Sequence, residues 1–246
     1  MIPLSKLRKQ KGRHAPPTEA ADEALPPSYR PYDSLKATFD FVLALLLIAL
    51  TLPVMLIAGL LVKLTSPGPA LYHQVRVGRD GRPFRIIKLR TMHHNCELLT
   101  GIRWASKGDP RVTPVGRLLR CTHIDELPQL WNVLRGEMSM VGPRPERPEF
   151  VGPLATAIPG YRGRLAVKPG ITGLAQIQLP ADTDIESVRE KLVLDLCYVK
   201  NSGPLLDARI LVGTMLYLAG VSYAGIRRAT VLPPTVHRAR PIPQVT

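Results

Sequence analysis

The longest run of apolar residues lies near the N-terminal end of the chain, from Phe41 to Val62 (FVLALLLIALTLPVMLIAGLLV). It contains no charged residue, and roughly 20 apolar residues are enough for a helix to cross a bilayer. A long polar leader precedes the run and no small-residue cleavage site follows it, so it is not a secretory signal peptide. The pattern therefore predicts a helix that enters a membrane.

Both flanks of this run are basic. The basic residues ahead of it are Lys6, Arg8, Lys9, Lys11, Arg13, Arg30 and Lys36, and those behind it include Lys63, Arg76, Arg79, Arg82, Arg85, Lys88 and Arg90. Because positive residues near a membrane segment stay in the cytoplasm, a segment that enters and leaves by the same face satisfies both flanks. Pro53 removes a helix hydrogen bond and predicts a sharp bend, where Thr51 could bond a freed carbonyl. We predict a re-entrant membrane helix over residues 32–66; an ordinary kinked transmembrane helix is the alternative.

The remaining periodic segments predict a mainly helical domain with one hairpin. Ala70–Val77 and Pro83–Leu89 contain β-branched residues and flank a turn rich in Gly and Asp, which predicts a β-hairpin. Helical periodicity favours Asp125–Leu134, Ile185–Tyr198 and Leu205–Leu218, the last apolar over most of its surface. The predicted fold class is α+β and mainly helical. It is a membrane-associated monotopic domain with an N-terminal re-entrant helix bent at a proline, a small β-hairpin and interfacial amphipathic helices.

The charge of the chain narrows the choice of partner. The 246 residues include 33 Lys and Arg against 19 Asp and Glu, giving a net charge of +14 and a pI near 10.1. This favours an anionic partner such as nucleic acid, an acidic membrane face or a phosphorylated substrate. Three widely spaced cysteines suit a reducing compartment. The length fits one catalytic domain over 67–226, between a disordered basic arm over 1–31 and a disordered Pro-rich tail over 227–246.

Candidate chemistry concentrates at two adjacent carboxylates, Asp125 and Glu126. The arginines nearest to them in sequence are Arg117, Arg120, Arg135, Arg144 and Arg147. A capping box from Thr122 to Asp125 would explain the acids as helix-capping groups, with the helix start keeping Asp125 ionised. Capping does not need the arginines, whose forked guanidinium groups match phosphate oxygens. Two carboxylates can share a magnesium ion that neutralises a diphosphate, and an ionised carboxylate can attack phosphorus, so the pattern indicates phosphoryl transfer.

Five motifs make the chain resemble a known family. They are Phe39–Phe41, Ser66–Pro69 (SPGP), Arg76–Met92, Asp125–Pro145 (beginning DELPQLWNVL) and Pro169–Gln176 (PGITGLAQ). Together they resemble the bacterial sugar transferase family, the monotopic polyprenyl-phosphate phosphoglycosyl transferases. The resemblance runs from about Lys36 to about Ala224, and because little sequence precedes the apolar run, the chain resembles the minimal catalytic form.

The resemblance implies a reaction and a set of roles. Asp125 would attack the β-phosphate of a nucleoside diphosphate sugar, expected to be a UDP-sugar, and would hold the phosphosugar covalently. A polyprenyl phosphate, expected to be undecaprenyl phosphate, would then accept the phosphosugar. Glu126 would hold Mg²⁺ together with Asp125 or assist the second step. The residues implied to bind substrate are Lys88, Arg90, Arg120 and Arg144.

The same resemblance implies a place in the cell. It predicts the bacterial inner membrane, with the catalytic domain on the cytoplasmic face, and a role in starting exopolysaccharide or another surface glycan. A homodimer stays open, as do the sugar, the pathway and the length of the lipid.

Two positions depart from the family pattern. Leu52 precedes the bend proline where serine is common, so a hydroxyl would have to come from Thr51. Pro180 stands where better-known members have an arginine, and Arg189 or Lys191 could replace it.

Two other classes of protein compete with the transferase hypothesis. A nucleic-acid-binding protein would be basic, but the apolar run and the arginines around paired acids do not suit a groove that follows a phosphate backbone, so no nucleic acid is expected. A non-catalytic, basic, membrane-anchored scaffold of a polysaccharide assembly complex would explain the apolar run without the Asp125–Glu126 pair. It remains the second hypothesis.

Overall fold

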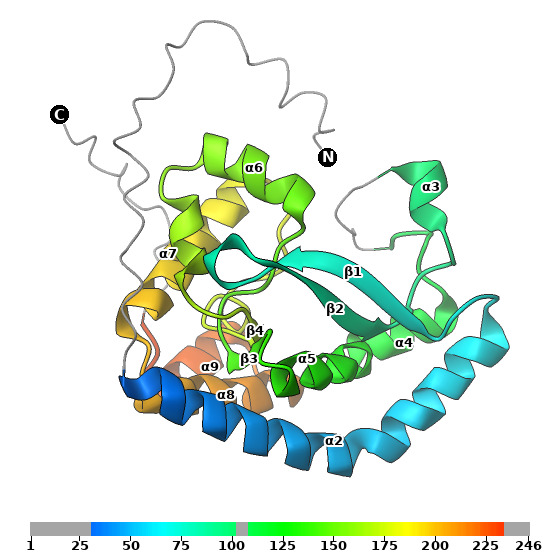
Figure 1. The fold of residues 1–246 in the computed structure, drawn as a ribbon, viewed down its shortest axis with the longest axis horizontal. Helices are drawn as coiled ribbons and strands as arrows, with labels where there is room; N and C mark the ends of the chain where they lie inside the picture. The colour runs from blue at the N-terminus through cyan, green and yellow to red at the C-terminus, as the bar shows by residue number, and fades with distance from the viewer. Residues whose placement is uncertain (1–30, 102–107, 234–246) are drawn as a thin grey trace, which may run out of the picture.

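A computed structural model describes residues 31–101 and 108–233 of the chain. It is mainly helical, with two small two-stranded sheets (Figure 1). The predicted basic arm and most of the predicted Pro-rich tail lie outside the described residues. The mainly helical prediction with a single antiparallel hairpin is confirmed for the described part of the chain.

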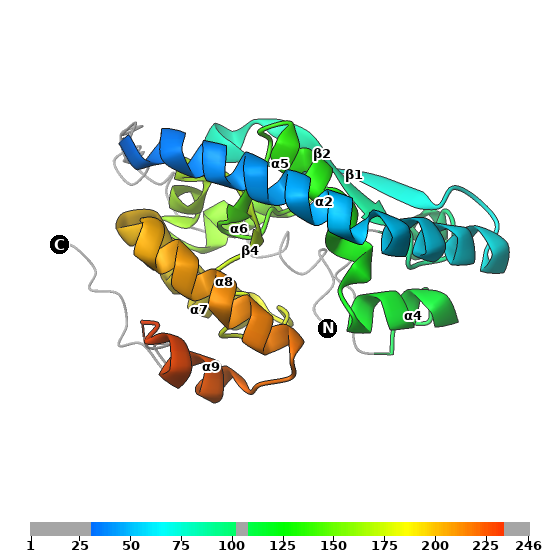
Figure 2. The ribbon, with the colours of Figure 1, turned by 90° about the horizontal axis from the view of Figure 1, so that it is seen from below.

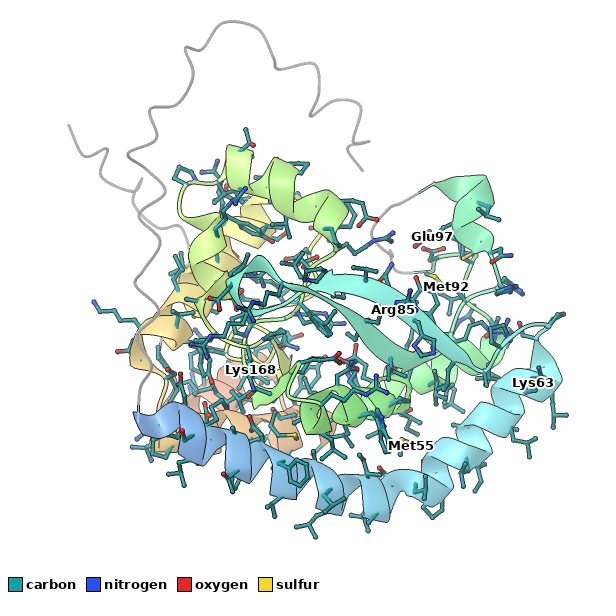
Figure 3. The ribbon with its side chains drawn as sticks, viewed as in Figure 1. Met55, Lys63, Arg85, Met92, Glu97 and Lys168 are labelled. Carbon is teal, nitrogen blue, oxygen red and sulfur yellow. The ribbon has the colours of Figure 1, made fainter. Side chains whose placement is uncertain are left out.

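The N-terminal helix α2 (Pro31–Thr65) is long, apolar and bent. Figure 1 shows it changing direction near its middle, and Met55, two residues after Pro53, lies at the bend in Figure 3. Proline cannot donate to the carbonyl four residues earlier, here that of Ala49. The Thr51 hydroxyl does not replace that donor, because it bonds the Leu47 carbonyl at 2.6 Å. The predicted rescue by Thr51 is therefore wrong, although the bend is present.

Both arms of α2 pack along the domain instead of projecting from it. Ala44 in the first arm is buried in the main core, and Ala58 and Val62 in the second arm pack with Leu89 and Leu119. The opposite face exposes a row of large apolar side chains, which includes Phe41, Leu45, Leu46, Leu50, Leu56, Ile57, Leu60 and Leu64. Among the described residues, α2 is the helix long and apolar enough to cross a membrane.

The predicted hairpin is confirmed. Strands β1 (Leu71–Val77) and β2 (Pro83–Leu89) pair antiparallel, with Leu71 opposite Leu89. The turn between them contains a short 3₁₀ segment, η2 (Arg79–Gly81), in which Asp80 and Gly81 have φ of 56° and 76°. Gly and Asp are among the residues that adopt positive φ at low energetic cost, so the turn residues explain the reversal.

Short elements follow the hairpin in the middle of the chain. They are α3 (Cys96–Thr100), α4 (Pro114–Cys121), η3 (Ile124–Gln129), α5 (Leu130–Leu134), β3 (Ser139–Val141), α6 (Pro148–Ala157), η4 (Tyr161–Ala166) and β4 (Gly170–Thr172). β3 and β4 pair in parallel.

The helix expected over Asp125–Leu134 is instead a 3₁₀ segment followed by one short α-helix, because Pro128 interrupts α-helical bonding.

The Thr122 capping box is also wrong. Thr122 is the C-terminal cap of α4, and its hydroxyl donates back to the carbonyls of Leu118 and Leu119. His123, with φ of 56°, reverses the chain before η3 begins. The acids of η3 therefore have no capping role that involves Thr122.

Three helices complete the described chain: α7 (Ile185–Asn201), α8 (Pro204–Leu218) and α9 (Tyr223–Thr230). The first two confirm the predicted helices. α9 extends into the segment expected to be disordered from residue 227, and Leu232 beyond it is buried. Figure 2 shows the molecule from the side on which α2, α4 and α8 lie. The α8 side chains of Leu205 and Met215 are exposed.

A buried carboxylate joins the first arm of α2 to the rest of the fold. Asp207, in the first turn of α8, accepts hydrogen bonds from the Tyr32 hydroxyl at 2.6 Å and the Tyr198 hydroxyl at 2.8 Å. It also accepts one from the Lys36 ammonium. One carboxylate thus connects α2, α7 and α8, and removing its charge leaves the half-buried Lys36 ammonium with only Asp40, at 3.8 Å, as a charged partner.

We expect Asp207→Asn to lower the melting temperature of the detergent-solubilised protein by about 5 °C or more, because charge-assisted hydrogen bonds are lost. Glu186→Gln, an exposed carboxylate on α7, is the matched control and should melt like the wild type. Thermal denaturation followed by circular dichroism measures both. Equal melting temperatures for the two variants would contradict the anchoring role of Asp207.

Candidate active site

Lys88 and Arg144, two of the residues predicted from the sequence, meet at the carboxylate of a third, Glu126. The Lys88 ammonium on β2 and the Arg144 guanidinium, in the loop after β3, each donate to Glu126 Oε1 at 2.7 Å. Arg144 also donates to Oε2 at 3.4 Å. Burial alone would oppose ionisation, but the charges and hydrogen bonds of Arg144 and Lys88 hold the pKa of Glu126 well below its usual value. Glu126 is therefore ionised, and both of its carboxylate oxygens accept hydrogen bonds from cations.

Asp125 is in the opposite situation. Its side chain is buried, with 7% exposed, and no donor among the described residues hydrogen-bonds its carboxylate. Burial, and secondly the neighbouring Glu126 charge, raise its pKa to about 6, against the attraction of Lys88, Arg120 and Arg144. Desolvation therefore outweighs the attraction of the positive groups. At neutral pH the carboxylate is still mostly ionised.

Arg120 lies close to this pair without contacting it by a hydrogen bond. Its Nε donates to the Thr91 hydroxyl at 2.8 Å. Burial lowers the pKa of Arg120, and the charge of Asp125 opposes that shift. Arg120 thus faces the nucleophile candidate as a nearby positive charge.

Arg90 is not brought to the carboxylate pair. Only 4% of it is exposed, and its guanidinium donates to the Ser66 hydroxyl at 3.1 Å, to the Ser66 carbonyl at 2.7 Å and to the Pro67 carbonyl. These contacts fasten the turn that follows α2 to the end of β2. The described contacts therefore give Arg90 a structural task, and its predicted role in substrate binding stays a prediction.

A small hollow lies beside Arg144. Its polar lining consists of Arg144, Glu146, Tyr161, Arg164, Gln176, Asp182, Lys191 and Asp195. Lys191 is ion-paired to Asp182 at 2.9 Å. By contrast, Arg189 donates to the Ala157 carbonyl on the exposed surface. Of the two cations considered as replacements for an arginine at Pro180, Lys191 is the one that lines the hollow.

Sequence reasoning missed Asn132, which is fully buried in α5. Its Oδ1 accepts from the Ile87 amide at 3.1 Å, and its Nδ2 donates to the Arg85 carbonyl at 2.7 Å. These bonds hold β2 next to η3 and α5 and so place Lys88 over Glu126. The signal was available in part: a polar residue stands inside an otherwise apolar helical pattern.

The residues present fit a magnesium site only in part. Among residues 31–101 and 108–233 there is no group of three or more His, Cys, Asp and Glu side chains placed to hold a metal. Mg²⁺ in phosphate sites uses one or two carboxylates and completes its shell with phosphate oxygens and water. The unbonded oxygens of Asp125 suit that arrangement, whereas those of Glu126 are occupied by Lys88 and Arg144.

Comparison with known proteins identifies the family. The family model described as bacterial sugar transferase matches residues 31–220. The chain belongs to the bacterial sugar transferase family. This is a family of enzymes, and the match confirms the resemblance seen in the motifs.

Several curated proteins are similar to the chain. A Caulobacter vibrioides protein named UDP-glucose:undecaprenyl-phosphate glucose-1-phosphate transferase is 46% identical over 74% of this chain and 69% of its own length. An Aeromonas hydrophila protein named UDP-N-acetylgalactosamine-undecaprenyl-phosphate N-acetylgalactosaminephosphotransferase is 44% identical, over 75% of this chain but only 43% of its own length. The Rhizobium leguminosarum bv. phaseoli exopolysaccharide production protein PSS is 40% identical over 74% of this chain and 94% of its own length.

We expect Asn132→Leu to release β2 from α5, because the Ile87 amide and the Arg85 carbonyl lose their partner. Each unsatisfied buried group costs about 1–3 kcal/mol. Hydrogen–deuterium exchange of the peptide covering residues 83–89 should become faster than in the wild type. Asn201→Leu, which changes an exposed asparagine at the end of α7, is the control. Unchanged exchange in the Asn132 variant would show that β2 is held by other contacts.

Proposed function

We propose that the protein is a phosphoglycosyl transferase. It moves a sugar 1-phosphate from a nucleoside diphosphate sugar, a UDP-sugar by analogy with its relatives, to undecaprenyl phosphate or a similar polyprenyl phosphate. The product is a polyprenyl diphosphate sugar that starts exopolysaccharide or another surface glycan. Relatives named for glucose and for N-acetylgalactosamine transfer have similar identities, so the sugar itself is left to a substrate panel.

The unequal environment of the two carboxylates is the observation that carries this proposal. Glu126 has both oxygens bound to cations, while Asp125 has no hydrogen-bond donor among the described residues and keeps its oxygens available. An ionised carboxylate without donors, buried beside positive charges, is suited to attack phosphorus. Asp125 is therefore the nucleophile in this proposal and Glu126 the residue that holds Lys88 and Arg144 in place.

The reaction proceeds in two displacements at one phosphorus atom. An Asp125 oxygen bonds the β-phosphorus of the nucleotide sugar, and the bond from that phosphorus to the bridging oxygen breaks, so nucleoside monophosphate leaves with the electron pair. The phosphosugar is then an acyl phosphate on Asp125. An oxygen of polyprenyl phosphate attacks the same phosphorus, the acyl phosphate bond breaks, and the Asp125 carboxylate is restored.

The surrounding cations have distinct tasks in this scheme. Lys88 and Arg144 can move part of their hydrogen bonding from Glu126 to phosphate oxygens as charge develops. Arg120, whose Nη groups are not used in its bond to Thr91, balances the charge near Asp125. Asp125 would hold a magnesium ion together with phosphate oxygens and water, and the ion would supply charge that neutralises the diphosphate.

The proposed location is the cytoplasmic face of the bacterial inner membrane, with α2 as a re-entrant helix. Two features support this topology. Each arm of α2 packs against the same domain, and the exposed apolar side chains lie on its opposite face. The flanks are basic on both sides, which retains both ends in the cytoplasm. A polyprenyl phosphate in the bilayer would then present its headgroup at the level of the catalytic domain.

We expect a covalent phosphosugar on Asp125. Purified protein, mixed with a UDP-sugar and Mg²⁺ without lipid acceptor, should release nucleoside monophosphate in a burst of about one equivalent and carry a phosphosugar that mass spectrometry maps to Asp125. Asp125→Asn should lose this burst, whereas Glu126→Gln should slow it. EDTA should abolish release. No release from any sugar nucleotide would favour the scaffold hypothesis, and an adduct on another residue would remove Asp125 from the nucleophile role.

Nucleotide release should depend on the ionisation of Asp125. Because its pKa is raised to about 6, the attacking form is lost as the pH falls through that value, and the rate should drop about tenfold per unit below it. Glu126 repels the Asp125 charge, so Glu126→Gln should move the midpoint to lower pH. Measuring the first displacement without acceptor avoids titration of the lipid phosphate. A rate independent of pH down to 5 would contradict this assignment.

The re-entrant topology predicts that both ends of α2 stay in the cytoplasm. Single cysteines at the exposed positions Ser34 and Pro69, in a background without the natural cysteines, should resist an impermeant thiol reagent in intact cells and react after permeabilisation. A separate variant that keeps Cys121, exposed on α4, as its single cysteine serves as the reference for the catalytic domain. Pro53→Leu should straighten the helix and reduce activity. Labelling of either end from outside intact cells would support a transmembrane span.

A further inference from the structure

Arg164 is a buried cation that the proposed chemistry does not use. It lies on η4 with 8% exposed, and its partner Asp195 on α7 has 3% exposed. The Arg164 Nε donates to Asp195 Oδ2 at 2.9 Å, and Nη1 donates to the Tyr161 hydroxyl at 2.8 Å. Two of the three guanidinium nitrogens are thereby directed at groups that fix the plane of the side chain.

The third nitrogen reaches the candidate active site. Arg164 Nη2, which also contacts Asp195, donates to the backbone carbonyl of Arg144 at 3.0 Å. Arg144 is the residue whose guanidinium binds Glu126. A single buried arginine therefore joins α7 and η4 to the residue that supports the acid pair.

The chain around Arg144 depends on such contacts because it has few backbone donors. Pro143 and Pro145 lack N–H groups, so this segment is held mainly through its carbonyls. Each of four successive carbonyls accepts a hydrogen bond: Pro143 from the Gly170 amide, Arg144 from Arg164, Pro145 from the Arg76 guanidinium, and Glu146 from the Val77 amide. The Arg164 contact is the one made at Arg144 itself.

Stability alone is a poor reason for this arrangement. Burying an ion pair removes two charges from water, and a pair of apolar side chains of similar size often stabilises a fold as well or better. An arginine fork with three differently aimed nitrogens instead fixes the position of the groups it bonds. The arrangement therefore serves to fix the position of a backbone carbonyl rather than to gain stability from buried apolar surface.

We propose that Arg164 is a positioning residue for Arg144. Held by Asp195 and Tyr161, it fixes the Arg144 carbonyl so that the Arg144 guanidinium stays on Glu126 and faces the substrate phosphates. This inference rests on the proposed transferase function, in which Arg144 supports the attack by Asp125. Arg164 itself contacts neither Glu126 nor Asp125 in the described structure.

The test is a double-variant cycle on nucleoside monophosphate release, measured with purified full-length protein and a UDP-sugar. Arg164→Lys keeps the positive charge beside Asp195 but cannot keep all three directed bonds, and it should lower kcat/KM about tenfold. Tyr161→Phe, which removes one hydroxyl, should cause a smaller loss in the same direction. Arg162→Met changes an exposed arginine of the same 3₁₀ segment and should behave like the wild type.

The cycle distinguishes positioning from a general structural role. If Arg164 acts through Arg144, adding Arg164→Lys to Arg144→Ala should change kcat/KM less than about twofold. A full multiplicative loss in the double variant would overturn the proposal, and so would wild-type kinetics for a folded Arg164→Lys protein. Absence of release by the wild type would instead refute the proposed function, so the two failures are distinguishable.

The division of the loss between kcat and KM gives a second readout that loosened packing far from the site would not reproduce. Arg164→Lys and Arg144→Ala displace the same guanidinium, so the two variants should divide their losses between kcat and KM in the same way. A loss in Arg164→Lys that is divided differently from the loss in Arg144→Ala would overturn the proposal.

Discussion

The charged hydrogen bonds on Glu126 hold together segments that are far apart in the chain. Lys88 comes from β2, Glu126 from η3 and Arg144 from the loop after β3, and the two cations meet on one carboxylate oxygen at 2.7 Å each. The contact satisfies one acid and leaves its neighbour without a donor among the described residues. Burial raises the pKa of Asp125. The same burial keeps its carboxylate poorly solvated, so its oxygens are available to react with a phosphate.

The apolar helix α2 and the candidate site are held by some of the same residues. Asp40 in α2 accepts a hydrogen bond from the Ser139 hydroxyl at 2.6 Å, and Ser139 begins the strand β3 that leads to Arg144. The Tyr198 hydroxyl lies within hydrogen-bond distance of the Val141 carbonyl at the end of β3 as well as Asp207. These buried polar contacts join α2 to β3, the strand that leads to the substrate-binding candidate Arg144. Any disturbance of the first arm of α2 therefore bears directly on the geometry near Glu126.

Two predictions from the sequence are wrong for identifiable reasons. Thr122 matched a capping pattern, yet the chain turns at His123, so the hydroxyl bonds the preceding helix. Thr51 could bond the carbonyl that Pro53 leaves free, yet its hydroxyl bonds the Leu47 carbonyl. In each case a local pattern fitted two partners, and the path of the backbone selected one of them.

The sequence by itself determined the apolar helix with its proline bend, the hairpin, the helices α7 and α8, and the family with its acid pair. These features depend on periodicity, on backbone restrictions at Pro and Gly, and on motifs that stand within short stretches of chain. Only the tertiary structure decided that Lys88 and Arg144 bond Glu126 while no described side chain bonds Asp125. It also decided that Asn132 and Arg164 support the site and that Lys191 lines the hollow beside Arg144. Those properties depend on burial and on contacts between residues tens of positions apart, because hydrogen-bond partners and desolvation are set only when distant segments pack together.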